Sequence, residues 1–179
     1  MKEKVVITGG SGLIGIPLTQ LLLQNGYEVV HLTRERNSRC GVKTYLWNTR
    51  ANFIEEGALE NASHIIHLAG SGIAEGKWTD ERKKSILKSR TKTIEFLYRK
   101  VKEKNISLKS FISASGISIY GTRTVEEIFT EEKTPLQHDL PNDFAAQVVF
   151  EWEEAADLFS SDCRVVKLRT GIVLDTNGG

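Results

Sequence analysis

The sequence predicts an α/β fold in which helices cover both faces of a doubly wound parallel sheet. Short apolar runs typical of buried strands alternate along the chain with segments whose apolar residues recur at helical spacing. Hydrophobic residues make up 40% of the 179 residues, which is ample for a core. Because the alternation is regular, we expect parallel strands joined by right-handed crossovers.

A glycine-rich stretch, T-G-G-S-G-L-I-G at Thr8–Gly15, joins the first expected strand, Lys4–Thr8, to the first helix. In this Rossmann-type context the first glycine allows a tight turn, the second lets a pyrophosphate approach the backbone, and the third lets the helix pack on the strand. Free N–H groups at the helix N-terminus then face the anion. The predicted cofactor contacts in this turn are Gly9, Gly12, Leu13, Ile14 and Gly15. The alternative is a glycine-rich turn that binds no ligand.

The second expected strand, Glu28–Arg34, follows a stop at Gly26, and the end of this strand sets the choice of cofactor. An acid there binds the ribose of NAD, whereas a basic residue accommodates the extra phosphate of NADP. Arg34 occupies this position, with Arg36 and Arg39 close behind, and arginine forms charge-assisted pairs with phosphate. NADP is therefore the predicted cofactor, with NAD as the second choice. A solvated basic loop is the alternative, and it suits Arg36 and Arg39 better than Arg34.

The third and fourth strands are expected at Lys43–Trp47 and His64–Gly70, with a short helical turn about Phe53–Leu59 between them. Small residues end the fourth strand where backbone must pass close to the cofactor. The contacts predicted there are Leu68, Ala69 and Gly70. The sequence offers His67 no partnered carboxylate, so we interpret it as a packed, hydrogen-bonded residue rather than a proton shuttle.

A long helix is expected from Thr79 to Lys104, with Thr79 or Asp80 as its cap. Its apolar stripe contains two polar positions among Ile86, Arg90, Thr93, Ile94, Leu97 and Val101. A charged Arg90 on a core-facing stripe costs free energy unless it is paired, so Arg90 is a candidate ligand of the cofactor or of a neighbouring loop. We interpret the remaining cations as the solvent face of the helix rather than a nucleic-acid patch.

The fifth expected strand, Leu108–Ser115, ends in serines that a doubly wound sheet places beside the nicotinamide ring. Ser113 is predicted to contact the cofactor. An acidic loop, Glu126–Asp139, then leads to a helix about Asp143–Phe159 and to a sixth strand, Arg164–Arg169.

The charge balance is nearly neutral, with 24 basic and 23 acidic side chains. This balance gives no global attraction to nucleic acid or to an anionic membrane, so any anion site must be local. The two cysteines, Cys40 and Cys163, suggest neither a disulfide framework nor a metal site, and a reducing, cytoplasmic location is expected. No apolar run approaches membrane-spanning length. We expect one domain, residues 1–179, with a small-molecule substrate as its partner and a homodimer as an allowed assembly.

Several motifs resemble those of the extended short-chain dehydrogenase/reductase superfamily, in its epimerase and dehydratase branch. The stretch Thr8–Gly15 resembles the cofactor fingerprint of that superfamily, H-L-A-G at His67–Gly70 its strand-four motif, and S-I-Y-G at Ser118–Gly121 the end of its strand-five motif. The segments L-T-R, W-T-D-E-R-K, S-R-T-K-T, S-A-S and R-T-G-I-V-L are similar to an atypical subgroup labelled epimerase family proteins or nucleoside-diphosphate-sugar epimerases, and sometimes cell-division-inhibitor-like. The resemblance covers the whole chain and implies NAD(P) binding and a nucleotide-sugar substrate.

The chain departs from this resemblance at the residues that transfer protons. Typical active members carry a Tyr, and four residues later a Lys, at the start of the helix after strand five. Phe144 stands where the Tyr would be and Val148 where the Lys would be, so the usual acid–base mechanism cannot run through that pair. Ser115 matches the family's catalytic Ser, although the loop to Tyr120 is one residue longer than usual. Tyr120 is the other candidate catalytic residue, although a structural or pocket role suits it better than that of a displaced catalytic tyrosine.

A second departure is length, because extended members add a substrate-binding region after strand six that this chain is expected to lack. Two functions stay open. The first is an NADP-dependent oxidoreductase or epimerase acting on a nucleotide-sugar-like or other small carbonyl substrate. The second is a regulatory or sensor protein that binds NADP without turnover, which Phe144 and Val148 favour. An interaction protein that has lost the cofactor is disfavoured by the intact glycine turn.

Overall fold

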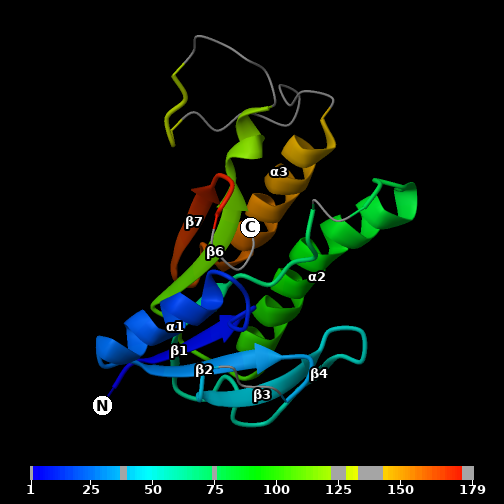
Figure 1. Cartoon of the computed structure of the whole chain (residues 1–179). Coiled ribbons are helices and arrows are strands. Elements are labelled where there is room, and N and C mark those ends of the chain that lie inside the picture. Colours follow the sequence, from blue (N-terminus) through cyan, green and yellow to red (C-terminus); the bar gives the residue numbers. More distant parts are fainter. Residues whose placement is uncertain (1, 37–39, 74–75, 122–127, 133–142, 175–179) are drawn as a thin grey trace.

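The protein folds around a seven-stranded sheet with the strand order β4-β3-β2-β1-β5-β6-β7 (Figure 1). The computed structural model describes residues 2–36, 40–73, 76–121, 128–132 and 143–174. The strands are β1 Lys4–Thr8, β2 Glu28–Thr33, β3 Lys43–Asn48, β4 Phe53–Ile54, β5 Ala62–His67, β6 Ser110–Gly116 and β7 Arg164–Thr170. The helices are α1 Gly15–Gln24, α2 Asp80–Glu103 and α3 Phe144–Ala156, with short 3-10 helices η1 Ile117–Tyr120 and η3 Asp157–Phe159.

The order of the strands confirms the doubly wound fold. From β1 the chain builds outward through β2 and β3, then returns to the other side of β1 and builds outward again through β5, β6 and β7. All of these neighbours pair in parallel. The switch in direction falls between β1 and β5, and in open α/β sheets a crevice for ligands lies at the carboxyl ends of the strands at such a point.

Two apolar clusters cover the two faces of the sheet. In β1, Val5 and Ile7 pack on one side with Leu18 and Leu22 of α1. Val6, on the opposite face, joins the larger cluster formed with α2 and α3. Figure 1 shows α2 and α3 side by side, apart from α1. The prediction of helices on both faces is therefore confirmed, with one α-helix on one face and two on the other in the described part of the chain.

The helical turn predicted about Phe53–Leu59 is wrong, because Phe53 and Ile54 form β4, an antiparallel edge strand on β3. A hairpin turn precedes it: the side chain of Asn48 accepts hydrogen bonds from the N–H groups of Arg50 and Ala51, and Asn52 has a φ of +52°. Glu55 continues the pairing through its N–H to Leu46 O at 2.8 Å. These turn-forming residues carry the local signal for a hairpin that the short apolar run obscured.

The alternation of strands and helices is also less regular than predicted. Among the described residues, no helix lies between β2 and β3 or between β3 and β5. Thr79 caps α2, as predicted, by accepting a hydrogen bond from Arg82 N, and Asp143 caps α3. Arg39 and most of the acidic loop 126–139 lie outside the described residues.

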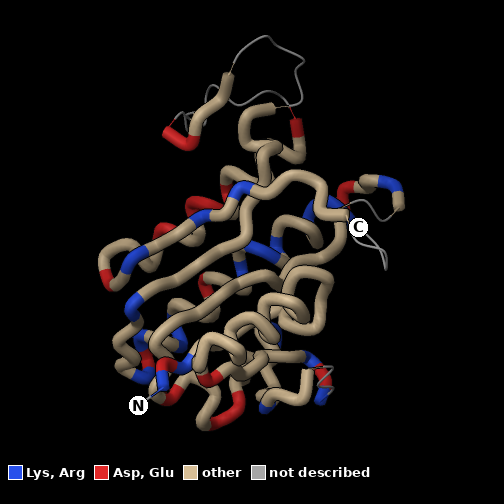
Figure 2. Tube along the Cα trace, turned by 60° about the vertical axis from the view of Figure 1, so that its left-hand side comes forward, with Lys and Arg blue, Asp and Glu red and all other residues tan. Residues whose placement is uncertain are grey.

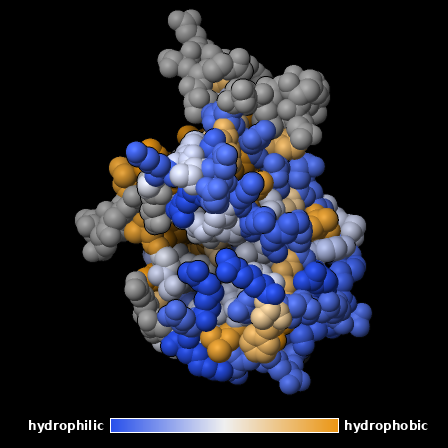
Figure 3. All heavy atoms as spheres, turned by 90° about the vertical axis from the view of Figure 1, so that its right-hand side faces the viewer, coloured by the Kyte–Doolittle hydropathy of each residue, from blue (hydrophilic) through white to orange (hydrophobic). Residues whose placement is uncertain are grey.

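The surface mixes charges of both signs, as the net charge of +1 implies. Figure 2 shows acidic and basic residues interspersed along the chain, and the face in Figure 3 is mainly hydrophilic with separate hydrophobic patches. None of the helices in the described part of the chain is long and apolar enough to cross a membrane. The same described residues hold no cluster of three or more side chains suited to a metal ion.

Candidate functional site

The turn between β1 and α1 is built so closely that two of its glycines are required by the fold itself. Gly9 has a φ of +72°, and a Cβ there would lie 2.9 Å from the backbone N of Ala69. A Cβ on Gly15 would lie 2.5 Å from Gly9 O, because the start of α1 packs directly on the turn. Gly12 N donates to Gly9 O at 3.0 Å and closes the turn. The tight turn and close helix packing predicted for Gly9 and Gly15 are thus present.

Gly10 is a further requirement that the sequence did not single out. A Cβ at Gly10 would lie 2.5 Å from the imidazole of His31, which is 1% exposed. The Nε2 of His31 lies 2.8 Å from the hydroxyl of Thr19 on α1, and burial lowers the pKa of His31. A neutral imidazole from β2 therefore supports the underside of the turn.

Gly12 differs from the other glycines of the turn because packing within the protein gives the weakest reason for a glycine at this position. The one atom that a Cβ at Gly12 would approach is Gly9 O, at 3.2 Å. The outer side of this glycine is otherwise open, at the place where a pyrophosphate would meet the N-terminus of α1. The residues present therefore fit a dinucleotide. Ile14, the N-cap of α1, is 38% exposed beside it. The cofactor contacts of Gly12, Leu13 and Ile14 stay predictions.

A buried chain of hydrogen bonds links β1, β5 and α2 at the carboxyl end of the sheet. Thr8 Oγ1 lies 2.8 Å from His67 Nδ1, and Thr93 Oγ1 of α2 lies 3.1 Å from His67 Nε2. Ala69 N donates to Thr8 Oγ1 at 3.3 Å, which fixes the loop after β5. Burial, with a smaller effect of Arg90, lowers the pKa of His67 to about 3. His67 is therefore neutral near pH 7 and confirmed as a packed, hydrogen-bonded residue.

Arg90 is buried, and it holds the loop that follows β5. It is 6% exposed, and it donates to Ser71 O at 3.0 Å and to Ile86 O at 3.1 Å. Its guanidinium also lies 4.9 Å from the centre of the Trp152 ring. Burial, with repulsion from Arg82, lowers the pKa of Arg90 to about 10, which still leaves it charged at pH 7. Of the two partners that the sequence predicts, the structure shows the neighbouring loop, while contact with the cofactor stays a prediction.

Arg34 is the cation best placed to receive a phosphate at the end of β2. It is exposed and follows directly after Thr33, the last residue of the strand. Arg36 instead pairs with Glu55, with 2.8 Å between nitrogen and oxygen. No ion pair engages Arg34 within the described part of the chain. The two arginines therefore differ in their ion pairing. This agrees with the sequence, where the alternative of a solvated basic loop suited Arg36 better than Arg34.

Ser115 does not face an open site, because its hydroxyl is bound in a buried cluster with α3. It donates to Glu153 Oε1 at 2.5 Å, and Arg169 of β7 binds both oxygens of Glu153, at 2.9 and 2.8 Å. Arg169 also donates to Tyr120 Oη at 2.7 Å, and that hydroxyl donates to Thr130 O at 3.1 Å. Ser115 and Tyr120, the two candidate catalytic residues, are thus joined through one ion pair. Their hydroxyl protons are already committed to acceptors within the protein.

The charge of this cluster is settled by its geometry. Burial acts to raise the pKa of Glu153, but the hydrogen bonds from Arg169 and Ser115 outweigh it, so the pKa of Glu153 is lowered. Hydrogen bonding to Glu153 in turn raises the pKa of Arg169. Glu153 and Arg169 were not among the functional residues predicted from the sequence. The signal that marked Arg90 was available for Glu153, which falls among the buried positions of α3 with Val149, Trp152 and Ala156.

The structure places the remaining sequence-predicted residues as follows. Ser113 is 1% exposed and donates to Ala114 O at 2.9 Å. Gly70 lies against Arg90, whose Cζ would be 3.2 Å from an added Cβ. Leu68 and Ala69 belong to the loop after β5 rather than to the strand. Cofactor contacts at these positions stay predictions.

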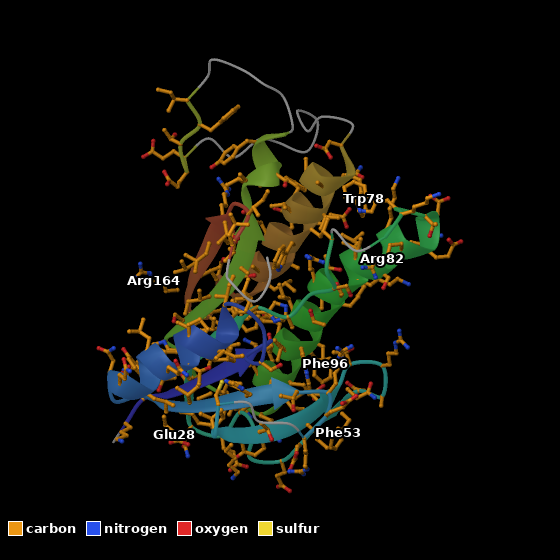
Figure 4. All side chains as sticks on the ribbon, in the orientation of Figure 1. Glu28, Phe53, Trp78, Arg82, Phe96 and Arg164 are labelled. Carbon is orange, nitrogen blue, oxygen red and sulfur yellow. The ribbon has the colours of Figure 1, made fainter. Side chains whose placement is uncertain are left out.

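Phe144 is the first residue of α3, and its surroundings are aromatic and cationic. Its ring makes a T-shaped contact with Trp78, with 5.2 Å between centroids, and Lys83 Nζ lies 5.5 Å from its centre. Val148, one turn later, is 1% exposed. Neither side chain can transfer a proton. Figure 4 shows Trp78 beside the start of α2, on the side that faces α3.

Comparisons with known proteins agree with this geometry. The family model described as "NAD dependent epimerase/dehydratase family" matches residues 5–166. Epimerase family protein YfhF of Bacillus subtilis is 34% identical over 184 residues, which cover 97% of this chain and 56% of YfhF. Human epimerase family protein SDR39U1 (isoform 2), solved with NADPH, superposes with a TM-score of 0.81 and 28% identity, over 98% of this chain and 56% of that one.

A nucleoside-diphosphate sugar epimerase from Corynebacterium glutamicum is also similar, with a TM-score of 0.78 and 33% identity over 100% of this chain and 36% of that one. The resemblance drawn from the sequence motifs is confirmed. The chain spans about half the length of the curated relatives that it matches, 57% in the case of an epimerase family protein from Staphylococcus aureus that is 29% identical over 99% of this chain.

Proposed function

Because the chain belongs to the NAD dependent epimerase/dehydratase family, we propose that it binds NADP(H) and forms the cofactor half of an epimerase-like oxidoreductase for nucleoside-diphosphate sugars. The observation that carries the proposal is the turn from β1 to α1, whose outer side is open at Gly12. The similar human protein was solved with NADPH, and the similar bacterial structure is a nucleoside-diphosphate sugar epimerase. Activity, substrate and partners of the whole protein belong to this proposal.

The residues that would hold the cofactor lie along the carboxyl edge of the sheet. N–H groups at the N-terminus of α1 would receive the pyrophosphate, and the exposed Arg34 would receive the extra phosphate of NADP. Thr8 and the neutral His67 keep the floor of the crevice uncharged and fix the loop that passes over it. When bound, NADP(H) supplies hydride transfer at its nicotinamide ring.

The residues beside that ring supply little acid–base chemistry. Phe144 and Val148 have no exchangeable proton, and the hydroxyl of Ser115 is held by a charged Glu153. This favours the second candidate, a regulatory or sensor protein that binds NADP without turnover. The two candidate functions use the same cofactor site. They differ in whether the protein transfers a proton to or from a substrate.

The shared claim is tested by isothermal titration of the chain with NADP⁺ and with NAD⁺. We expect NADP⁺ to bind more tightly, and we expect Arg34→Ala to remove this preference. Loss of an arginine–phosphate pair corresponds to about 1.5–3 kcal/mol, or roughly 10- to 150-fold in affinity. Arg36→Ala is the matched control, because it removes the same charge from the same loop but from a side chain paired with Glu55. An unchanged affinity ratio in Arg34→Ala, or an equal loss in Arg36→Ala, would contradict the assignment.

A further inference from the structure

The sequence motif W-T-D-E-R-K, Trp78–Lys83, is not explained by the cofactor site. Thr79 caps α2, which accounts for one residue of the motif. Trp78 precedes the cap, and 42% of the residue is exposed. Its indole N–H donates to Ile73 O at 2.9 Å, which fixes the orientation of the ring. An exposed indole face held in one orientation can pack against a flat ligand.

Trp78 and Phe144 form one aromatic corner from two helices. Their rings meet edge to face, and Phe144 opens α3 while Trp78 stands before α2 (Figure 4). Farther along the same two helices, Arg90 stacks on Trp152, so α2 and α3 run side by side in the same direction. Their N-termini therefore lie together, and both positive dipole ends point to the side where β5 and β6 end.

A cation completes the corner. Lys83 is half-buried, and its ammonium lies over the Phe144 ring. No ion pair engages Lys83 in the part of the chain that the structure describes. Arg82 donates to Gly72 O at 2.6 Å and so holds the loop after β5 against the same corner. An apolar ring face beside an ammonium that faces no carboxylate suits a ligand that is flat and anionic at once.

We infer that Trp78, Phe144 and Lys83 form a binding corner for the ring and phosphate of a sugar-phosphate substrate. A ring of the ligand packs on the exposed indole of Trp78, and its phosphate pairs with Lys83. Phe144, at the position where the resembling family has its proton-transferring Tyr, serves here as a wall of the binding site. This inference rests on the proposed function for the class of substrate, and it adds the residues that recognise that substrate.

The test is a calorimetric titration of the whole chain with UDP-glucose, in the presence of saturating NADP⁺. The variants are Trp78→Ala, which removes the ring surface, and Lys83→Met, which keeps the aliphatic stem and removes the charge. Lys84→Met is the matched control, because Lys84 is the next residue along and is exposed. We expect both corner variants to weaken UDP-glucose binding at least tenfold, with Lys84→Met within twofold of wild type. Trp78→Phe, which restores an aromatic ring, should recover part of the loss.

The NADP⁺ titration of each variant separates the outcomes. Normal NADP⁺ binding shows that a variant is folded, so an unchanged affinity for UDP-glucose in Trp78→Ala and Lys83→Met overturns the corner and leaves the proposed function standing. Wild-type chain that binds NADP⁺ but not UDP-glucose overturns the corner as well. A wild-type chain that fails to bind NADP⁺ contradicts the proposed function itself.

Discussion

The β1–α1 turn and the region where β6 leads to α3 differ in how far their functional groups are open to a ligand. At the β1–α1 turn, every glycine of the dinucleotide pattern is present, and the surrounding structure is shaped to keep the backbone open at Gly12. At the β6–α3 end, Phe144 and Val148 stand where the resembling family has its Tyr and Lys, and a buried ion pair engages Ser115. Under the proposed function, the chain keeps the cofactor turn but not the usual pair of proton-transferring side chains, and the predictions that follow test this contrast.

The largest effect is expected at the binding end. Gly12→Val should abolish NADP⁺ binding while the domain stays folded, because a branched side chain would occupy the space where the pyrophosphate meets the helix N-terminus. Isothermal titration measures the affinity, and circular dichroism reports the fold. Tight binding by Gly12→Val would place the cofactor elsewhere.

The catalytic end should respond to restoration of the missing pair. The double variant Phe144→Tyr with Val148→Lys places a phenol and, one helical turn later, an ammonium that favours the ionised phenol. General acid–base catalysis contributes about 10²- to 10⁴-fold, so the gain in turnover of a nucleotide sugar should be of that order. Wild-type turnover at rates ordinary for enzymes would show that another residue already moves the proton.

The buried ion pair should be a determinant of stability rather than of cofactor affinity. Glu153→Gln removes the buried carboxylate charge that both Arg169 and Ser115 bind, and the free energy of unfolding should fall by about 3 kcal/mol in chemical denaturation. Glu154→Gln, on the exposed side of α3, is the matched control and should change little.

The same variant has a predictable pH dependence. Since the pKa of Glu153 is lowered in the folded state, its stabilising effect is present above the ordinary glutamate pKa and is lost as pH falls through the folded value. The gap between wild type and Glu153→Gln should therefore narrow in acid. A gap that stays constant from pH 7 to pH 3 would rule out the ion pair as its cause.

The smallest effect is expected at His67, in the buried chain of hydrogen bonds that links β1, β5 and α2. Because the folded protein holds the pKa of His67 near 3 while the unfolded chain binds a proton near pH 6.5, stability should fall as pH drops below about 6.5. From this residue the loss approaches 1.4 kcal/mol per pH unit. In His67→Gln the slope of unfolding free energy against pH between 6 and 5 should be shallower by that amount. An identical slope in both proteins would mean that His67 is not the group responsible.

The sequence predicted the backbone of the β1–α1 turn far better than the surroundings of Ser115, for a physical reason. A turn such as Gly9–Gly15 is local, and its glycines report backbone constraints that act within a few residues. The cluster of Ser115, Glu153 and Arg169 joins three elements far apart in the chain, so no spacing rule brings them together. The edge strand at Phe53–Ile54 is a different case, because its pairing with β3 is local and the turn-forming Asn48 and Asn52 already carried its signal.

The most direct test of the contrast is a crystal structure of the chain with NADP⁺ bound. We expect the pyrophosphate against the backbone of Gly12, the 2′-phosphate on Arg34, and the nicotinamide end near Phe144, with the hydroxyls of Ser115 and Tyr120 still bound to their present partners. A 2′-phosphate away from Arg34 would contradict the binding half of the account. A hydroxyl of Ser115 or Tyr120 released from its present partner and directed at the nicotinamide would contradict the catalytic half.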